Sequence, residues 1–387
     1  MKPIDIVIGI TSYNEVCTIS DVTLQIDRGL QRFFPQLNAV ILNLDNCSMD
    51  GTREAFLATR TRTRKLYLPT SPGRVGKGEN LRNLLDFASA VNSEATATFD
   101  GDLRSMSPTW VKSLLSPVLD HGLDFAYPAY DRHRFDGTTT NLICYPIMVG
   151  AFCADIRQPI GGDFAFSHRC VNELRASQWP ASAHGFGVDI LMTTEVVMRG
   201  LNICGVQLGQ KIHRRRERST KGPMTRAVLD TLLFQMRKYR LQIEPLRAIE
   251  SPPIFVSRCP HKACPSVPVD YNAIKQHCLD GCAEHLEVYQ RALPSSVYLD
   301  LKRALEIQKV PDITSEIWTD ILCDLIECHL SSKEDVTAVP DSIVPLFFGR
   351  MLSFAKAAAK LSDEDVEGYI KRQGALFYRK RLRMFRG

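Results

Sequence analysis

Two aspartates separated by one glycine, Asp100-Gly101-Asp102, follow a short apolar stretch of the sequence at residues 96–99. The pattern predicts a strand whose end presents both carboxylates at the rim of a sheet. Paired oxygen ligands of this kind suit one hard divalent cation, which would in turn bind a diphosphate. A solvated turn is the alternative interpretation, since Asp-x-Asp triplets are common.

His213 follows an expected strand at 201–208 and precedes a basic run that begins with Arg214. An imidazole at this place could complete the coordination of a cation held by Asp102, with Mn²⁺ or Mg²⁺ favoured when most ligands are oxygens. Arg214 carries a planar fork of donors that matches phosphate or carboxylate. The alternatives are an ordinary surface or core histidine and a solvated arginine loop.

Gly76-Lys77-Gly78 stands where a glycine-rich loop opens an expected helix. The spacing of the first glycine and the final hydroxyl of the Walker pattern are both missing, so a nucleotide triphosphatase is not expected. Lys77 and the amides of a helix N-terminus would still attract a diphosphate. An ordinary capped surface loop is the alternative.

Two further features point to a ligand. Gly161 and Gly162 lack side chains and would expose their amides to a ligand, although a turn or bulge is an equally common use of such a pair. Asp189, in the first turn of an expected helix, would contact a sugar hydroxyl or the acceptor, or would only complement the helix dipole.

The elements that must position these residues alternate along the first hundred residues. Short apolar strands are expected near 4–10, 39–44, 65–68 and 96–100, with helices between them. Such alternation predicts a parallel sheet covered by helices, in which ligands bind outside the carboxyl ends of the strands. Residues 142–152 form a mixed apolar segment without a clear period, and from about residue 223 the pattern is helical.

Composition excludes several classes of function. The net charge of +5 among 387 residues is too small to predict nucleic-acid binding, and no apolar run reaches the roughly 20 residues of a membrane span. Twelve cysteines without a secretory leader favour reduced thiols and a cytoplasmic protein. Cys259, Cys264, Cys278 and Cys282 leave structural zinc open, against a cysteine-rich loop and helix.

Several motifs together resemble a known family. The opening segments 11–15 and 44–52 and the Asp100-Gly101-Asp102 triplet look like the nucleotide-sugar half of a GT-A glycosyltransferase of the family-2-like kind. More specific is the order of the later motifs, which is similar to that of mannosylglycerate, glucosylglycerate and glucosyl-3-phosphoglycerate synthases. These motifs are Gly76-Lys77-Gly78, residues 134–138, residues 157–163, Gly187-Val188-Asp189 and Lys211-Ile212-His213.

The resemblance covers about residues 4–235 and implies an α/β fold of the GT-A type, a Rossmann-like mixed sheet flanked by helices. We expect a catalytic domain at 1–250, with a nucleotide-sugar half at 1–105 and an acceptor half at 106–250. A helical C-terminal region would follow at 251–387, and it is a candidate surface for a homodimer.

By resemblance, the activity would be a metal-dependent, anomer-retaining transfer of glucose or mannose from a UDP- or GDP-sugar. The acceptor would be a small anion, glycerate or 3-phosphoglycerate, and the product a glycosylglycerate of the kind that serves as a compatible solute. The open alternatives are a polysaccharide or lipid-linked acceptor, for which the basic terminal segment 380–386 is the one weak membrane candidate, and a non-catalytic nucleotide-sugar binder.

The resemblance also implies roles for single residues. Asp102 and His213 would hold Mg²⁺ or Mn²⁺, and the catalytic residues would be Asp189, Asp102 and Arg214. The residues expected to bind the donor are Thr11, Tyr13, Glu15, Asp45, Lys77, Asp100 and Gly101. The residues expected to bind the acceptor are Arg134, Ile160, Gly161, Gly162 and Arg214.

Two departures from the pattern bear on specificity. Phe186 stands where relatives often carry a tryptophan, so the preference for the sugar or the acceptor can differ. The arginine run after His213 is dense, which favours a phosphorylated acceptor.

Overall fold

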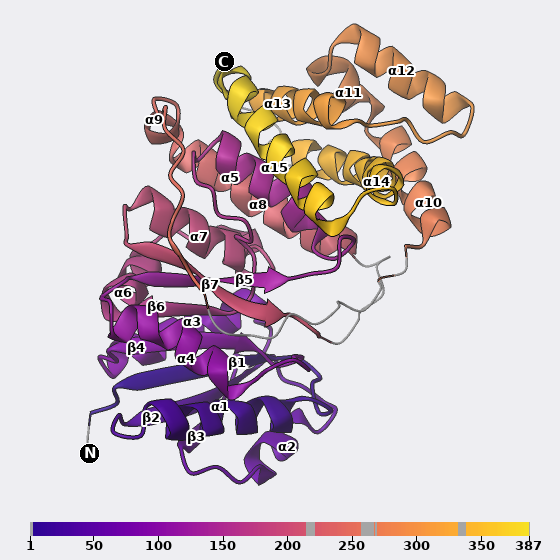
Figure 1. Ribbon diagram of the computed structural model, residues 1–387. Coiled ribbons are helices and arrows are strands. Elements are labelled where there is room, and N and C mark those ends of the chain that lie inside the picture. Colours follow the sequence, from indigo (N-terminus) through magenta and orange to yellow (C-terminus); the bar gives the residue numbers. More distant parts are fainter. Residues whose placement is uncertain (1–2, 214–220, 257–266, 268, 332–337, 387) are drawn as a thin grey trace. The chain divides into compact units, whose positions relative to one another are not determined.

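A computed structural model describes residues 3–213, 221–256, 267, 269–331 and 338–386 (Figure 1). The chain divides into two compact units. The first contains residues 1–132, 158–215 and 252–264, and the second contains residues 133–157, 216–251 and 265–387. These units differ from the predicted division at residue 250, because two segments before that residue pack with the C-terminal helices.

The first unit is built on an eight-stranded sheet with the order β3-β2-β1-β4-β6-β5-β7-β8. Strands β1 to β4 pair in parallel, whereas β6 runs antiparallel to both of its neighbours. The sheet is therefore mixed, as expected. The strands are β1 (Ile6–Ser12), β2 (Ala39–Asp45), β3 (Arg64–Pro69), β4 (Ala95–Asp100), β5 (Phe125–Asp131), β6 (Phe164–Ser167), β7 (Ile203–Gln210) and β8 (Ile254–Phe255).

Helices cover both faces of this sheet (Figure 1). Ile6, Ile8 and Ile10 of β1 face the core formed with α1 (Ile19–Phe33), α2 (Thr52–Ala58) and α4 (Pro108–Leu119). The opposite face carries α3 (Lys77–Ala90) and α6 (His168–Ala176), and α7 (Val188–Met198) packs against these two helices. Because both faces are covered, every residue of β1 is buried. The strands predicted in the first hundred residues are confirmed.

The second unit is helical in its described part. Its helices are η1 (Thr140–Cys144), α5 (Tyr145–Gly150), α8 (Lys221–Lys238), α9 (Arg240–Ile243), α10 (Tyr271–Glu284), α11 (Leu286–Ala292), α12 (Ser295–Glu306), α13 (Ser315–Ser331), α14 (Ala338–Ala358), α15 (Asp363–Lys380) and η4 (Arg381–Phe385). Segment 142–152 gave no clear period in the sequence because η1 and α5 are buried on all sides.

The terminal basic segment lies against the second unit. Lys380 and Arg383 pair with Asp320, and the guanidinium of Arg381 is buried against backbone carbonyls that include Gly150 O at 2.9 Å. These contacts commit Lys380, Arg381 and Arg383 inside the unit and argue against this segment as a membrane helix. None of the helices among the described residues is long and apolar enough to cross a bilayer.

The cysteine cluster divides between described and undescribed residues. Cys259 and Cys264 lie outside the described residues. Cys278 and Cys282 are buried in α10, where the hydrogen bond between them, followed by burial, raises the pKa of the Cys282 thiol. The question of zinc at these four cysteines stays open.

Candidate functional site

The register of the sheet gathers several of the predicted residues at one edge. Thr11 of β1 lies beside Asp100 of β4, and Ser12 lies beside Asp45 of β2. The hydroxyl of Thr11 is 3.4 Å from the carboxylate of Asp100. Because these strands are parallel, their carboxyl ends meet at the edge where α/β sheets bind ligands.

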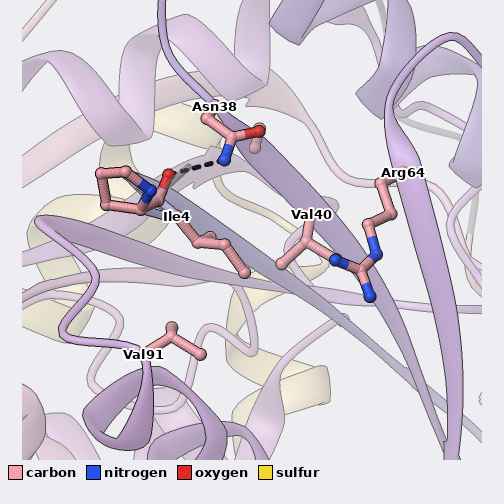
Figure 2. A pocket seen from close by; sticks show the side chains of 7 residues that line it. Ile4, Asn38, Val40, Arg64 and Val91 are labelled. Carbon is pink, nitrogen blue, oxygen red and sulfur yellow. Dashed lines mark hydrogen bonds between the residues drawn. The ribbon is translucent and has the colours of Figure 1, made fainter. Parts of the chain in front are cut away.

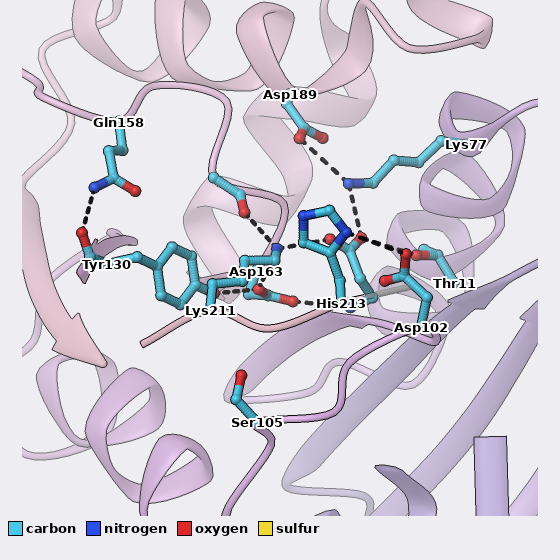
Figure 3. A network of polar contacts seen from close by, with 12 residues as sticks. Thr11, Lys77, Asp102, Ser105, Tyr130, Gln158, Asp163, Asp189, Lys211 and His213 are labelled. Carbon is cyan, nitrogen blue, oxygen red and sulfur yellow. Dashed lines mark hydrogen bonds and ion pairs between the residues drawn. The ribbon is translucent and has the colours of Figure 1, made fainter. Parts of the chain in front are cut away.

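Asp102 and His213 come together through backbone contacts between the segments that carry them. Leu103 forms an isolated antiparallel bridge with His213, and the amide of Arg104 donates to Ile212 O at 2.8 Å. As a result, Nδ1 of His213 lies 3.9 Å from Oδ2 of Asp102 (Figure 3). The structure therefore pairs the two predicted metal ligands.

In an octahedral site with bonds near 2.1 Å, neighbouring ligand atoms lie about 3 Å apart and opposite ones about 4.2 Å apart. The 3.9 Å between Nδ1 of His213 and Oδ2 of Asp102 is wider than neighbouring ligands require, so the two side chains would have to move about 1 Å closer to bind one ion as neighbours. Asp102 and His213 supply two ligands, and no group of three or more His, Cys, Asp or Glu side chains is arranged for a metal elsewhere in the described residues. Mg²⁺ commonly completes such a site with phosphate oxygens and water.

Lys77, Asp100 and Asp189 form a largely buried cluster at the same edge, in which Figure 3 labels Lys77 and Asp189. The ammonium of Lys77, at the start of α3, lies 2.9 Å from Oδ1 of Asp100 and 3.2 Å from Oδ2 of Asp189. A lysine has three N–H donors, and these two partners among the described residues leave one donor for an anion. The other oxygen of Asp189, Oδ1, is buried without a hydrogen-bond partner in the described part of the chain.

The charges of this cluster shift one another's pKa values. Burial opposes the charged form of Lys77, but Asp100 and Asp189 outweigh it and raise the pKa of the ammonium. Burial likewise opposes ionisation of Asp100, yet Lys211 and Lys77 hold its pKa well below the usual range. Burial raises the pKa of Asp189, and Lys77 offsets only part of that effect.

Lys211 and Asp163 are functional candidates to which the sequence reasoning assigned no role. The ammonium of Lys211 lies 2.8 Å from Oδ2 of Asp100 and 2.9 Å from Oδ2 of Asp163, and both side chains are almost fully buried. Asp163 also accepts a hydrogen bond from the amide of Asp100 and another from the hydroxyl of Tyr130. The sequence did carry a signal for both residues. Asp163 is a charged residue between a glycine pair and the apolar β6, and Lys211 is a charged residue at the end of β7.

The glycines of the motifs are explained by close packing. Gly162 has a φ of +93°, and a Cβ there would stand 2.4 Å from Oδ2 of Asp100. A Cβ at Gly78 would stand 1.9 Å from Ala183 O, and the amide of Gly78 already donates to Gly185 O. The Gly78 amide is therefore bonded to the backbone, and anion binding by Lys77 stays a prediction.

The remaining donor-side residues occupy the turns after β1 and β4. Tyr13 is 47% exposed, whereas Glu15 is buried, and its backbone amide donates to the hydroxyl of Thr52. Gly101 has no room for a side chain, because a Cβ would stand 2.8 Å from Thr11 O. Contacts of these residues with a donor stay predictions.

Asp45 is a structural anchor at the end of β2. Its carboxylate is fully buried and accepts hydrogen bonds from Ser12, from the amide and the hydroxyl of Ser48, and from Tyr67. Four bonds fill the ordinary acceptor capacity of a carboxylate. These bonds hold the turn after β2, and direct donor binding by Asp45 stays a prediction.

The predicted acceptor residues are distributed over both units. Gly161, Gly162 and the half-buried Ile160 belong to the first unit. Arg134 belongs to the second, where its guanidinium donates to the carboxylate of Asp363 at 2.7 Å and to carbonyls at the end of α14. Arg214 lies outside the described residues. Their roles in acceptor binding stay predictions.

A pocket of about 390 Å³ opens at the opposite edge of the sheet, near the first residues of β2 and β3 (Figure 2). None of the residues predicted for the site lines it, and parallel sheets bind ligands at the other edge. We therefore assign it no role. Its lining residues are Pro3, Ile4, Asn38, Ala39, Val40, Arg64 and Val91.

Comparison with known proteins gives relatives of one kind. Glucosyl-3-phosphoglycerate synthase of Mycobacterium tuberculosis is 29% identical to this chain over 239 residues, an alignment that covers 57% of this chain and 70% of that protein. The enzyme of the same name from Mycolicibacterium smegmatis is 29% identical over 211 residues, which cover 50% of this chain and 66% of that protein. No protein-family model matches the chain.

Crystal structures of the M. tuberculosis enzyme also resemble this chain, at 26% sequence identity. One, in complex with Mn²⁺, uridine diphosphate and phosphoglyceric acid, covers 60% of this chain and 78% of that chain with a TM-score of 0.49. Another, in complex with Mg²⁺ and uridine diphosphate, has a TM-score of 0.48. The sequence relatives confirm the resemblance predicted from the motifs, and this chain is similar in sequence to glucosyl-3-phosphoglycerate synthase.

Proposed function

We propose that this chain transfers glucose from UDP-glucose to the hydroxyl of 3-phosphoglycerate, with retention at the anomeric carbon. The observation that carries the proposal is the placement of two groups at one edge of the sheet, the Asp102–His213 pair and the cluster of Lys77, Asp100 and Asp189. The curated relatives at 29% identity, which are named for this product, support the choice of sugar and acceptor.

In this proposal Asp102 and His213 hold Mn²⁺ or Mg²⁺, which neutralises charge on the diphosphate of the donor. Lys77 contributes its remaining N–H donor to the same diphosphate. Asp100 keeps that ammonium charged and in place, because its Oδ1 is 2.9 Å away. The side chains thus oppose the negative charge that grows on the leaving group.

Asp189 receives the acceptor hydroxyl in this proposal. Its buried Oδ1 is without a partner in the described part of the chain, and a buried acceptor of this kind is costly until a donor arrives. The bond between the anomeric carbon and the phosphate oxygen breaks, and the acceptor oxygen forms the new bond on the same face. The acceptor's proton passes to the departing phosphate oxygen.

Transfer to glycerate, or from GDP-mannose, is the second candidate within the same site. The dense arginines after His213 favour the phosphorylated acceptor, although Arg214 lies outside the described residues. A lipid-linked acceptor has less support, because the basic terminal segment is docked on the second unit through Arg381 and Arg383.

A donor-by-acceptor screen tests the proposal. Purified protein would be incubated with Mn²⁺ and each pairing of UDP-glucose, GDP-glucose or GDP-mannose with 3-phosphoglycerate or glycerate, and the release of nucleoside diphosphate would be measured. We expect the highest kcat/KM with UDP-glucose and 3-phosphoglycerate. Absence of nucleoside diphosphate release with every pair would contradict the proposal. A higher kcat/KM with another pair would show that the proposed donor or acceptor is wrong.

A further inference from the structure

Lys211 follows β7 and is buried deeply for a lysine, with 4% of its side chain exposed. Its ammonium contacts three oxygens from two segments, Oδ2 of Asp100 at 2.8 Å, Gly161 O at 2.8 Å and Oδ2 of Asp163 at 2.9 Å (Figure 3). A lysine has three N–H donors. All three donors therefore have protein partners and none is left for a ligand. This arrangement suits Lys211 for orienting the side chains and backbone around it.

The first partner, Asp100, connects Lys211 to the donor side of the site. One oxygen of Asp100 meets Lys211, and the other lies 2.9 Å from the ammonium of Lys77. If Lys211 lost its charge, the buried carboxylates of Asp100 and Asp163 would face each other without the cation between them. Like charges in a buried site repel strongly, so Asp100 would turn and Lys77 would lose the closer of its two carboxylate partners, keeping only Asp189.

The second partner, Gly161 O, connects Lys211 to the turn that precedes β6. Gly162, the next residue of this turn, packs against the same ion pair, since a Cβ there would stand 2.4 Å from Asp100 and 3.0 Å from the ammonium of Lys211. The position of the ammonium therefore fixes the turn that carries Gly161 and Gly162, which are the predicted acceptor residues of the first unit.

We propose that Lys211 is a positioning residue that couples the donor and acceptor sides of the site. One ammonium orients the carboxylate that anchors Lys77 and also orients the turn of Gly161 and Gly162. This inference rests on the proposed function for the identity of the ligands, whereas the contacts that carry it belong to the protein alone.

The test uses Lys211→Met alone and combined with Asp163→Asn. The single variant leaves two buried carboxylates unbalanced and can fail to fold, whereas the double variant removes one charge of each sign. Lys65→Met is the matched control, because Lys65 contacts carbonyls such as Leu57 O at 2.9 Å at the end of α2, away from the site. Circular dichroism would establish folding before any kinetic comparison.

We expect the folded double variant to bind UDP with Mn²⁺ about tenfold more weakly and to raise KM for both donor and acceptor, the effect of losing one charge-assisted contact on each side. The control should keep both KM values. A double variant with both KM values and UDP affinity unchanged would overturn the inference, as would a change on one side only.

Failure of the proposed function would give a different pattern, because the wild type itself would then transfer no sugar. The inference would in that case be judged from a crystal structure of the double variant. Displacement of the Asp100 carboxylate and of Gly161 O from their wild-type positions would support it. Unmoved groups would overturn it.

Discussion

At the scale of single residues, the site concentrates buried charge where a diphosphate and a cation would bind. The sequence predicted Lys77, Asp100 and Asp189 for the site because each stands at a strand end or a helix start, and the structure brings the three together. The sequence motifs assigned no role to Lys211 and Asp163. Their contacts depend on β6 and β7 lying near the end of β4, which local sequence patterns do not reveal.

The pKa of Asp189 makes stability depend on pH. Burial raises this pKa, with Lys77 opposing. An acid with a higher pKa in the folded state contributes stability below its unfolded value, and this contribution is lost as pH rises through the folded-state pKa. The melting temperature of Asp189→Asn, relative to wild type, should therefore increase from about pH 4 to about pH 7. We expect sugar transfer to fall at least about tenfold, since the acceptor loses a charged partner.

Asp365→Asn is the control of opposite sign for these melting curves. Hydrogen bonds from Ser362 at the start of α15 lower the pKa of Asp365. Its contribution to stability is therefore present above the unfolded pKa and is lost as pH falls. The melting temperature of Asp365→Asn, relative to wild type, should therefore decrease as pH rises. A pH-independent difference for Asp189→Asn would contradict the role given to its burial.

At the scale of elements, strand ends and turns place the chemistry. The parallel strands β1 to β4 were predictable because buried apolar runs alternated with helical segments. The helices at 140–150 were not, since a fully buried helix gives no clear period. Periodicity also does not reveal that β6 runs antiparallel between β4 and β5; the mixed sheet was expected from the family resemblance alone. The turn before β6 nevertheless carries two of the predicted acceptor residues, Gly161 and Gly162.

Gly162→Ala tests the turn before β6. The variant would adopt a positive φ and place a Cβ 2.4 Å from the Asp100 carboxylate. Gly122→Ala is the matched control, with a φ of +64° and nothing within 4 Å of the added atom. Both variants should lose about 1 kcal/mol of unfolding free energy to backbone strain. Gly162→Ala should lose about 1 to 3 kcal/mol more from the clash with Asp100, and urea denaturation measures both losses.

Only Gly162→Ala should also lose sugar transfer, by at least about tenfold, because the added atom displaces the charged group that anchors Lys77. Initial rates at saturating donor and acceptor would show the difference. Equal activity of the two variants would mean that the turn tolerates displacement of Asp100, against the site described here.

At the scale of the whole molecule, the chain combines a sheet unit that holds the described site with a second unit that is helical in its described part. The sequence predicted helices throughout the C-terminal part but not the segments 133–157 and 216–251 that join them. Such long-range packing depends on which buried faces match, and one sequence does not specify that. Pairing of subunits through the helical region stays a prediction.

The second unit contains a buried arginine, and replacing it tests how much its hydrogen bonds stabilise the unit. Arg350 is 1% exposed and donates to Ile313 O, Ser315, Tyr369 and Gln373. Arg350→Met should lower the unfolding free energy by about 2 to 4 kcal/mol, because several buried acceptors lose their donor.

The exposed Arg372 of α15 supplies the control for this experiment. Arg372→Met should stay within about 0.5 kcal/mol of wild type. Urea denaturation followed by far-ultraviolet circular dichroism measures both variants. An Arg350→Met protein as stable as the control would show that this network does not stabilise the unit.

The central claim is that Asp102 and His213 bind one divalent cation beside the anchored ammonium of Lys77. Crystals grown with Mn²⁺ and UDP, measured at a wavelength where manganese scatters anomalously, test it most directly. The account predicts an anomalous peak bonded to the Asp102 carboxylate, to a ring nitrogen of His213 and to the diphosphate, with Lys77 touching that diphosphate. A peak away from either side chain, or UDP bound elsewhere, would contradict it.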